Sequence, residues 1–480
     1  MRQHTAGPDS ARNAGALRWR SGAPDRGEST RFRQCPGVRG SGRCCGESAH
    51  RVALSMGSGF LQGNRRRRRA DASGLSSRRR HGERLLWGIP LTLVAVAGLL
   101  IASTQRQAPY ADWYQHWITA AFGIGVALLL ARMKLERLKP LLAPIYALTV
   151  ISLIAVRVIG TSALGAQRWI SIGGVHVQPS EFAKLAAILL LAAVLDRHPV
   201  ERPVDLLRPL GVISLPWLLV FIQPDLGTSL VFGALLLVML YWSGMPFEWL
   251  VLLLAPLGTA LLAGLLPWAL LLWVPLMMAI AFRSLPWKRI AAAVVLAIQG
   301  AVAFITPWLW MHGLKDYQRD RLVLFLDPSK DPLGGGYHLL QSTVGIGSGG
   351  LFGTGLLQGQ LTKLRFIPEQ HTDFIFSALG EETGYLGTVL VVVGFALLMA
   401  RMLQVANRAR SDFDSLVVVG VATMLMFQVV VNIFMTIGLG PVTGIPLPFM
   451  SYGRSAMVVN FIALGLCLSV ARRERQGLIR

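Results

Sequence analysis

Apolar residues fill long stretches of this 480-residue chain, and short polar segments separate them. Stretches such as 85–103, 416–435 and 455–470 hold close to the roughly 20 apolar residues that a helix needs to cross a bilayer. The pattern predicts an all-α, polytopic membrane protein with about twelve spans. We place these spans at 85–105, 113–132, 139–158, 180–195, 206–222, 226–243, 247–265, 267–282, 289–311, 373–401, 416–438 and 455–471.

The stretch 247–282 decides the number of spans. It is apolar almost throughout and contains Pro256 and Pro267, and we interpret it as two spans. A single span would reverse the orientation of everything downstream and place Arg408 and Arg472 outside, against the positive-inside rule. With two spans and an internal N-terminus, both termini are cytoplasmic. The segments then placed on the outer face are 160–179, 311–372 and 438–454.

Composition and charge agree with a membrane protein. Only 15% of the residues are charged, where a soluble domain would have about 25%. The formal net charge of +22 comes largely from the segment before residue 85, and the rest recurs between apolar stretches. This distribution favours a membrane-surface role over nucleic-acid binding. Cysteine spacing indicates no metal site.

The chain divides into three parts by composition. Residues 1–83 are rich in Arg, Gly and Ser, and we expect a basic, disordered cytoplasmic tail, with Met56 as an alternative start. Residues 84–472 form the transmembrane domain, in which 312–372 is a long extracytoplasmic loop, and 473–480 is a short cytoplasmic tail.

Charged residues gather where the first outer segment meets the bilayer. Pro179-Ser180-Glu181 predicts a helix start with Ser180 as N-cap. Glu181 and Lys184 are three residues apart and share a helix face, so they form either a neutralising pair or part of a polar cavity at the outer leaflet. Arg168 lies nearby in the sequence.

Asp225 follows the fifth predicted span with almost no loop. It either caps the next helix or takes part in a polar site. Arg157 lies inside an apolar stretch, and it either pairs with one of these acids or extends its cation to the membrane interface.

Two segments are too irregular for membrane helix. In the long outer loop, Asp316–Arg321 alternates acids and bases, so Arg319 either makes local ion pairs or binds an anionic head group. The glycines at 345–350 of the same loop favour a flexible turn over a phosphate loop. The segment 440–455 contains three prolines and three glycines, and at membrane depth it must be buried against protein or line a cavity.

His371 and Asp373 directly precede an apolar stretch that contains Glu381 and Glu382. Asp373 is either an interfacial carboxylate held by His371 or an arginine, or a partly desolvated general base. For Glu381 and Glu382, which lie deeper, we expect a structural network of partners.

Together these stretches resemble the SEDS family of cell-wall membrane proteins, over about residues 85–472. Asp316-Tyr317-Gln318-Arg319 is closer to RodA-type than to FtsW-type members. The motifs that carry the resemblance are Gln167-Arg168-Trp169, Gln178-Pro179-Ser180-Glu181-Phe182-Ala183-Lys184, Gln223-Pro224-Asp225-Leu226-Gly227-Thr228-Ser229, Gly345-Ile346-Gly347-Ser348-Gly349-Gly350, Pro368-Glu369-Gln370-His371-Thr372-Asp373, Gly444-Ile445-Pro446-Leu447-Pro448 and Ser451-Tyr452-Gly453.

The resemblance implies a peptidoglycan glycosyltransferase that polymerises lipid II at the outer face of the cytoplasmic membrane during elongation, with a class B penicillin-binding protein as partner. It implies Asp373 as the catalytic residue. The substrate-binding candidates are Arg168, Glu181, Lys184, Asp225, Arg319 and His371. No cofactor is required by the sequence, although Mg²⁺ or another divalent cation would suit the pyrophosphate.

This chain departs from the family in two respects. Members commonly have ten spans, and two more are inserted here between about residues 245 and 289. Arg454 stands where members usually have Gly, and it could add a contact to pyrophosphate. The alternative functions are a lipid II flippase or other polyprenyl-linked sugar transporter, a non-catalytic scaffold that activates the penicillin-binding protein, and a division-type polymerase similar to FtsW.

Overall fold

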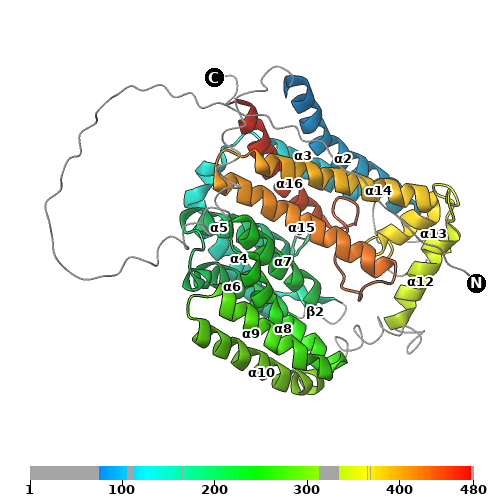
Figure 1. Cartoon of the computed structure of the whole chain (residues 1–480). Coiled ribbons are helices and arrows are strands. Elements are labelled where there is room, and N and C mark those ends of the chain that lie inside the picture. Colours follow the sequence, from blue (N-terminus) through cyan, green and yellow to red (C-terminus); the bar gives the residue numbers. More distant parts are fainter. Residues whose placement is uncertain are drawn as a thin grey trace, which may run out of the picture. The chain divides into compact units, whose positions relative to one another are not determined.

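The computed structural model describes residues 75–104, 113–163, 166–173, 175–223, 225–312, 335–364, 366–367 and 369–476, all within the unit Met56–Arg480. This part of the chain is almost entirely helical, as the apolar pattern predicts (Figure 1). The α-helices are α2 (Leu75–Thr104), α3 (Trp113–Leu130), α4 (Leu142–Ile159), α5 (Pro179–Arg197), α6 (Leu207–Ile222), α7 (Leu226–Trp242), α8 (Phe247–Leu265), α9 (Leu270–Ser284), α10 (Lys288–His312), α12 (Gly335–Ser348), α13 (Gln360–Leu364), α14 (Ile375–Asn407), α15 (Asp412–Thr436) and α16 (Arg454–Gln476). Short 3₁₀ segments, η2 (Leu135–Leu141), η3 (Pro203–Leu206) and η4 (Pro267–Ala269), precede α4, α6 and α9.

Each of the predicted apolar stretches coincides with a helix. Within the described ranges, nine helical segments are long and apolar enough to cross a membrane, judged by length and composition. They contain α2, α4, α6, α8, α9, α10, α14, α15 and α16. The remaining predicted stretches form α3, α5 and α7, which are shorter or more polar.

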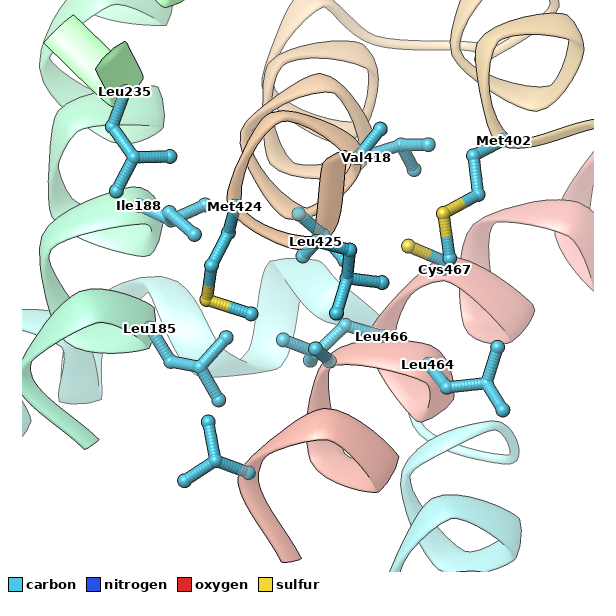
Figure 2. Close-up of a cluster of buried hydrophobic side chains, with 14 of the residues drawn as sticks. Leu185, Ile188, Leu235, Met402, Val418, Met424, Leu425, Leu464, Leu466 and Cys467 are labelled. Carbon is cyan, nitrogen blue, oxygen red and sulfur yellow. The ribbon is translucent and has the colours of Figure 1, made fainter. Parts of the chain in front are cut away.

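The position of α5 in the bundle explains how this helix can carry charged residues. This helix contacts α4, α6, α7, α15 and α16, so other helices rather than lipid surround it. A helix that is buried on most of its faces can carry charged side chains, provided that they find partners in protein. Figure 2 shows the apolar core around it, where Leu185 and Ile188 of α5 approach Met424 of α15 and Leu235 of α7.

Helices α8, α9 and α10 contact one another, and α8 contacts α7 (Figure 1). The pair of spans predicted as an insertion, at about 245–289, forms α8 and α9 of this group. Polar side chains join the three helices: Thr259 of α8 donates to Gln299 of α10, and the indole of Trp273 in α9 donates to Thr259 at 3.0 Å. In a bilayer such bonds contribute to helix association, because lipid removes the hydrophobic drive between helices.

A small antiparallel sheet lies in the segment between α4 and α5, which the sequence analysis did not predict. Its strands are β1 (Thr161–Ala163), β2 (Ala166–Ile172) and β3 (Val175–Val177), in the order β1-β2-β3. Ile170 pairs with Val177 and Ile172 with Val175. Gly173 takes φ +57° in the tight turn between them, a conformation that glycine adopts without strain.

The segment before α14 is also more regular than a loop. The described part contains α12 and α13, and Gly345 and Gly347 lie within α12 rather than in a turn. The segment between α12 and α13 packs against α14 at Gly384, which takes φ +66° and interrupts the helix. Tyr385 N–H donates to Gly350 C=O at 2.9 Å, and Thr354 N–H donates to Glu381 C=O at 2.9 Å. The helix break is therefore satisfied by neighbouring backbone.

Glu381 and Glu382 hold this segment in place, which confirms the expected structural network. The Glu381 carboxylate is 1% exposed and accepts from Leu361 N–H at 2.7 Å, Thr362 N–H at 2.8 Å and the Thr362 hydroxyl at 2.6 Å. Glu382 accepts from Leu357 N–H at 3.0 Å and from the Ser103 hydroxyl of α2. Both acids therefore serve as hydrogen-bond acceptors for the folded segment before α14.

Replacing Glu381 by Gln should loosen this segment. The amide presents an NH₂ group to backbone donors, so we expect a loss of about 1–3 kcal/mol in the free energy of unfolding and faster proteolysis within 354–364. Thermal unfolding in detergent and limited proteolysis measure the two effects. Glu248→Gln, at an exposed carboxylate on α8, is the control. Equal stability and proteolysis of the two variants would contradict the structural role of the Glu381 hydrogen bonds.

Candidate active site

His371, Thr372 and Asp373 lie in the turn 369–374 that leads into α14. All three are half-buried, whereas Phe374 and the following residues are buried. The His371 carbonyl accepts from Tyr452 N–H at 2.8 Å, and the Asp373 carbonyl accepts from the Asn432 side-chain amide at 2.8 Å. The backbone of this motif is therefore fixed by α15 and by the irregular segment 440–452.

The Asp373 carboxylate is directed at Gly444. A Cβ at position 444 would lie 3.3 Å from Asp373 Oδ2. The His371 ring lies beside the Tyr452 ring, with centroids 5.9 Å apart. His371 therefore contributes to the wall of the site from the same turn as Asp373.

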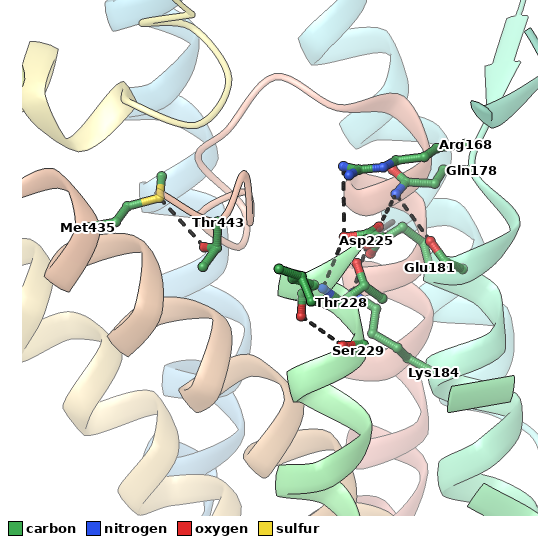
Figure 3. Close-up of polar contacts among 11 residues, drawn as sticks. Arg168, Gln178, Glu181, Lys184, Asp225, Thr228, Ser229, Met435 and Thr443 are labelled. Carbon is green, nitrogen blue, oxygen red and sulfur yellow. Dashed lines mark hydrogen bonds and ion pairs between the residues drawn. The ribbon is translucent and has the colours of Figure 1, made fainter. Parts of the chain in front are cut away.

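Arg168, Gln178 and Asp225 form a second polar group (Figure 3). Arg168 Nη1 lies 3.8 Å from Asp225 Oδ1, and Gln178 Nε2 lies 3.5 Å from Asp225 Oδ2. Asp225 Oδ1 also accepts from Thr228 N–H at 3.2 Å, which makes Asp225 the N-cap of α7. Asp225 is therefore a cap, as one alternative expected, and its role in a substrate site stays a prediction. Its cationic partner is Arg168 of β2, whereas Arg157 is exposed on α4.

Glu181 and Lys184 form a buried ion pair in the first turns of α5. Lys184 Nζ lies 2.7 Å from Glu181 Oε1, and the two side chains are only 1% and 3% exposed. Glu181 Oε2 is buried and has no hydrogen-bond partner among the described residues. The N-cap of α5 is Gln178 and not Ser180, because Pro179 occupies the first helical position, where its missing N–H costs nothing.

The segment 440–452 lies between the two polar groups. A Cβ on Gly227, two residues after Asp225, would lie 2.8 Å from both Thr443 C=O and Ile445 Cγ1. Ile445 C=O accepts from Asn432, whose amide also holds Asp373. The expectation that this irregular segment is buried against protein is confirmed, since Thr443, Ile445 and most residues of 447–451 are buried.

A cavity of about 510 Å³ opens between α3, α5, β3 and the start of α16. Its walls are mostly apolar, from residues such as Ile118, Phe122 and Phe182, and Arg454 and Gln115 supply polar groups. The Arg454 guanidinium donates to Gln115 Oε1, which also accepts from the Tyr452 hydroxyl at 3.1 Å. Tyr452 therefore links the cavity to the turn that carries His371.

The structure brings His371 and Asp373 against the segment 440–452, and it brings Asp225 near this segment through Gly227. Arg319 lies outside the described residues, so its role remains a prediction. Within the described ranges, no three His, Cys, Asp or Glu side chains come together as metal ligands, and the divalent cation stays a prediction tied to the pyrophosphate. Asn432, Gln115 and Gln178 were missed as site residues. A lone Asn inside the apolar stretch 416–438 was the available signal for the first of them.

The fold and site define a polytopic helical membrane protein whose polar residues converge near the starts of α5, α7, α14 and α16. Residues 83–272 and 266–476 match the model of the FtsW, RodA and SpoVE family, described as "Cell cycle protein". The chain belongs to this family, and it is a multi-pass membrane protein. The two matched ranges meet at 266–272, between α8 and α9, where the sequence analysis places the inserted spans.

Curated relatives and solved structures agree with this assignment. The chain is 38% identical over 330 residues to the peptidoglycan glycosyltransferase MrdB of Escherichia coli (strain K12), covering 68% of this chain and 76% of the relative. It is 35% identical over 390 residues to the peptidoglycan glycosyltransferase RodA of Treponema pallidum (strain Nichols), covering 76% and 90%.

One similar solved chain belongs to a structure of a peptidoglycan synthase complex that coordinates polymerization and crosslinking. It has a TM-score of 0.60 and 30% identity, and the match covers 81% of this chain and 98% of that chain. Another is the rod shape determining protein RodA of Thermus thermophilus, with a TM-score of 0.53, 25% identity and coverage of 81% and 96%.

Lys184→Met should destabilise the fold by about 3–5 kcal/mol, because it leaves the Glu181 carboxylate buried without its cation. The double variant Glu181→Gln with Lys184→Met should recover most of this loss, as measured by unfolding in detergent. Lys139→Met is the matched control, since its ion pair with Asp196 is 28% and 20% exposed and should contribute only about 0–1 kcal/mol. A double variant as unstable as the single one would argue against an isolated charge as the cause.

Proposed function

We propose that this protein polymerises lipid II into glycan strands, with Asp373 as the catalytic base. It is a peptidoglycan glycosyltransferase of the RodA type, which acts in cell elongation; the curated relatives MrdB and RodA carry this enzyme name. The single observation that carries the mechanism is the half-buried Asp373 carboxylate, which faces Gly444 from a turn that is fixed at its backbone on two sides.

In the proposed reaction, the 4-hydroxyl oxygen of the acceptor's GlcNAc attacks the anomeric carbon of the donor. A bond forms between them, and the bond from that carbon to the pyrophosphate oxygen breaks. Asp373 takes the hydroxyl proton as the attack proceeds, and undecaprenyl pyrophosphate leaves with the electron pair. Partial desolvation suits a carboxylate to this task, because it raises the affinity of the base for a proton.

Cations near the site stabilise the pyrophosphate as its negative charge grows. Lys184 is poorly suited to direct contact, because its ammonium is buried and paired with Glu181. Arg454 is better placed, since it lines the cavity, and Arg168, whose side chain is 15% exposed, is a second candidate. Arg319 remains a further candidate. Glu181 and Asp225 then act by holding these cations, and His371 lies against the substrate beside Asp373.

The cavity suits the lipid part of the substrate. Its apolar walls lie between helices with exposed apolar faces, such as those of Ile118 and Phe122, so an isoprenoid chain can enter from the bilayer. Arg454 then lies beside the polar end of that lipid, where an arginine binds phosphate through more than one N–H group.

The active site faces the outside of the cytoplasmic membrane, with both termini inside. The helices α5, α14 and α16 begin at the site and end at the opposite side of the bundle. Basic residues gather at that opposite side, as the positive-inside rule requires of the cytoplasmic face. They are Arg132, Lys134, Arg137, Lys139, Arg197, Arg408, Arg410, Arg472 and Arg473.

The partner is a class B penicillin-binding protein, which crosslinks the strands. A relative of similar fold takes part in a complex that couples polymerization and crosslinking, and this supports such an assembly for the present chain. The higher identity to RodA and MrdB than to the FtsW of Coxiella burnetii, at 30%, favours elongation over division.

Asp373→Asn should abolish glycan polymerisation. Asn keeps the size of the side chain and cannot accept the proton, so we expect a loss of at least about 100-fold in polymer formed from labelled lipid II by the purified protein with its partner. Gel analysis of the strands measures it, and an unchanged melting temperature is the folding control. Wild-type ladders from the variant would remove Asp373 as base, and lipid translocation without polymer would favour a transporter.

Arg454→Gln should raise the KM for lipid II by about tenfold with little change in kcat, because it removes a charged contact to the pyrophosphate and keeps the polar contact to Gln115. Initial rates across lipid II concentrations measure both constants. Arg157→Gln, which removes an exposed arginine outside the cavity, should leave both unchanged. Equal effects of the two substitutions would contradict a head-group contact at Arg454.

A further inference from the structure

Asn432 is a buried polar side chain in the apolar helix α15. It is 0% exposed, and its flanking residues in 429–435 are mainly apolar. A buried amide in a membrane helix costs free energy unless its donors are satisfied. Asn432 therefore has a specific structural task, and its contacts define that task.

The Asn432 amide nitrogen donates two hydrogen bonds, each to a backbone carbonyl outside the helix. One acceptor is Asp373 C=O and the other is Ile445 C=O, both at 2.8 Å. The two carbonyls belong to irregular segments, the turn 369–374 and the segment 440–452. Backbone acceptors in buried irregular chain need such partners, and a single NH₂ group satisfies both. Asn432 thus fixes the distance between these two segments.

Gly444 lies in the second segment, next to Ile445, and faces the Asp373 side chain. It takes φ +72°, and a Cβ added at this position would lie 3.3 Å from Asp373 Oδ2. The absence of a side chain therefore leaves room for the carboxylate. Both features therefore act on Asp373. The Asn432 hydrogen bond holds its backbone, and the missing side chain at Gly444 leaves space for its carboxylate.

We propose that Asn432 is a positioning residue for glycan polymerisation and that, with Gly444, it sets where the Asp373 carboxylate lies relative to the segment 440–452. Asn432 acts through the Asp373 backbone and does not itself touch the reacting atoms. This inference rests on the proposed role of Asp373 as base. A displacement of about 1 Å in a catalytic group is enough to reduce a rate by about 100-fold.

The first test replaces Asn432 by Leu, which has a similar size and no donors. In the full-length protein with its partner and labelled lipid II, kcat should fall by about 10- to 100-fold, while KM stays within about threefold. Asn460→Leu, at a buried asparagine of α16, is the matched control and should change kcat by less than about threefold. A fall in both variants alike, or a rise in KM at constant kcat for Asn432→Leu, would overturn the positioning role.

The second test compares two glycines with similar backbone φ angles. It does not depend on whether Asn432→Leu folds. Gly444→Ala and Gly438→Ala both place a methyl group on a residue with positive φ, +72° and +80°. The methyl at 438 meets only Thr343 and Leu339 at 3.5 and 3.8 Å, whereas the methyl at 444 meets the Asp373 carboxylate. We expect a loss of kcat of about tenfold or more for Gly444→Ala alone, and equal losses would overturn the inference.

Asp373→Asn in the same assay separates the two levels of the argument. Full activity of Asp373→Asn would remove the proposed base, and the positioning role with it. An inactive Asp373→Asn beside active Asn432→Leu and Gly444→Ala would overturn only the positioning role.

Discussion

A bilayer offers no water to a backbone that leaves the helix, so each irregular stretch at membrane depth must find its hydrogen bonds within the protein. The site depends on this constraint at two places. The break at Gly384 is satisfied by backbone groups of 350–355, and the segment 440–452 is held by Asn432, Tyr452 and Ser451. The chain can therefore place irregular backbone close to Asp373 and keep that backbone ordered.

The same constraint applies to charge. Glu181 and Lys184 neutralise each other inside the bundle, and α5 can carry them because other helices surround it. Glu381 and Glu382 accept hydrogen bonds from backbone N–H groups of the segment before α14. In these cases an acid that looks costly beside apolar sequence is stabilised by a named partner, and Asp373, which stays half-buried, differs from the fully buried acids.

Among the described residues, the apolar stretches predicted each of the helices long and apolar enough to cross a membrane, because apolar sequence reports directly on burial in lipid or protein. They contain less information about partners distant in the chain. Asp225 was recognised as a cap or site residue, but its pairing with Arg168 depends on where β2 brings that arginine, far from Asp225 in the sequence. The strands were missed because the alternation at Ile170, Ile172, Val175 and Val177 is short and lies between spans. Asn432 was missed because one polar residue hardly changes an apolar pattern.

The cations near the site differ in how far their charge is compensated. The buried pair of Glu181 and Lys184 has no net charge, because the ammonium and the carboxylate neutralise each other inside the bundle. Arg168 is 15% exposed, and its guanidinium lies 3.8 Å from the Asp225 carboxylate. Arg454 lies at the cavity with a neutral partner, Gln115, and keeps its full charge. The uncompensated positive charge beside the cavity therefore comes from Arg454 and not from Lys184, whose charge is neutralised by Glu181.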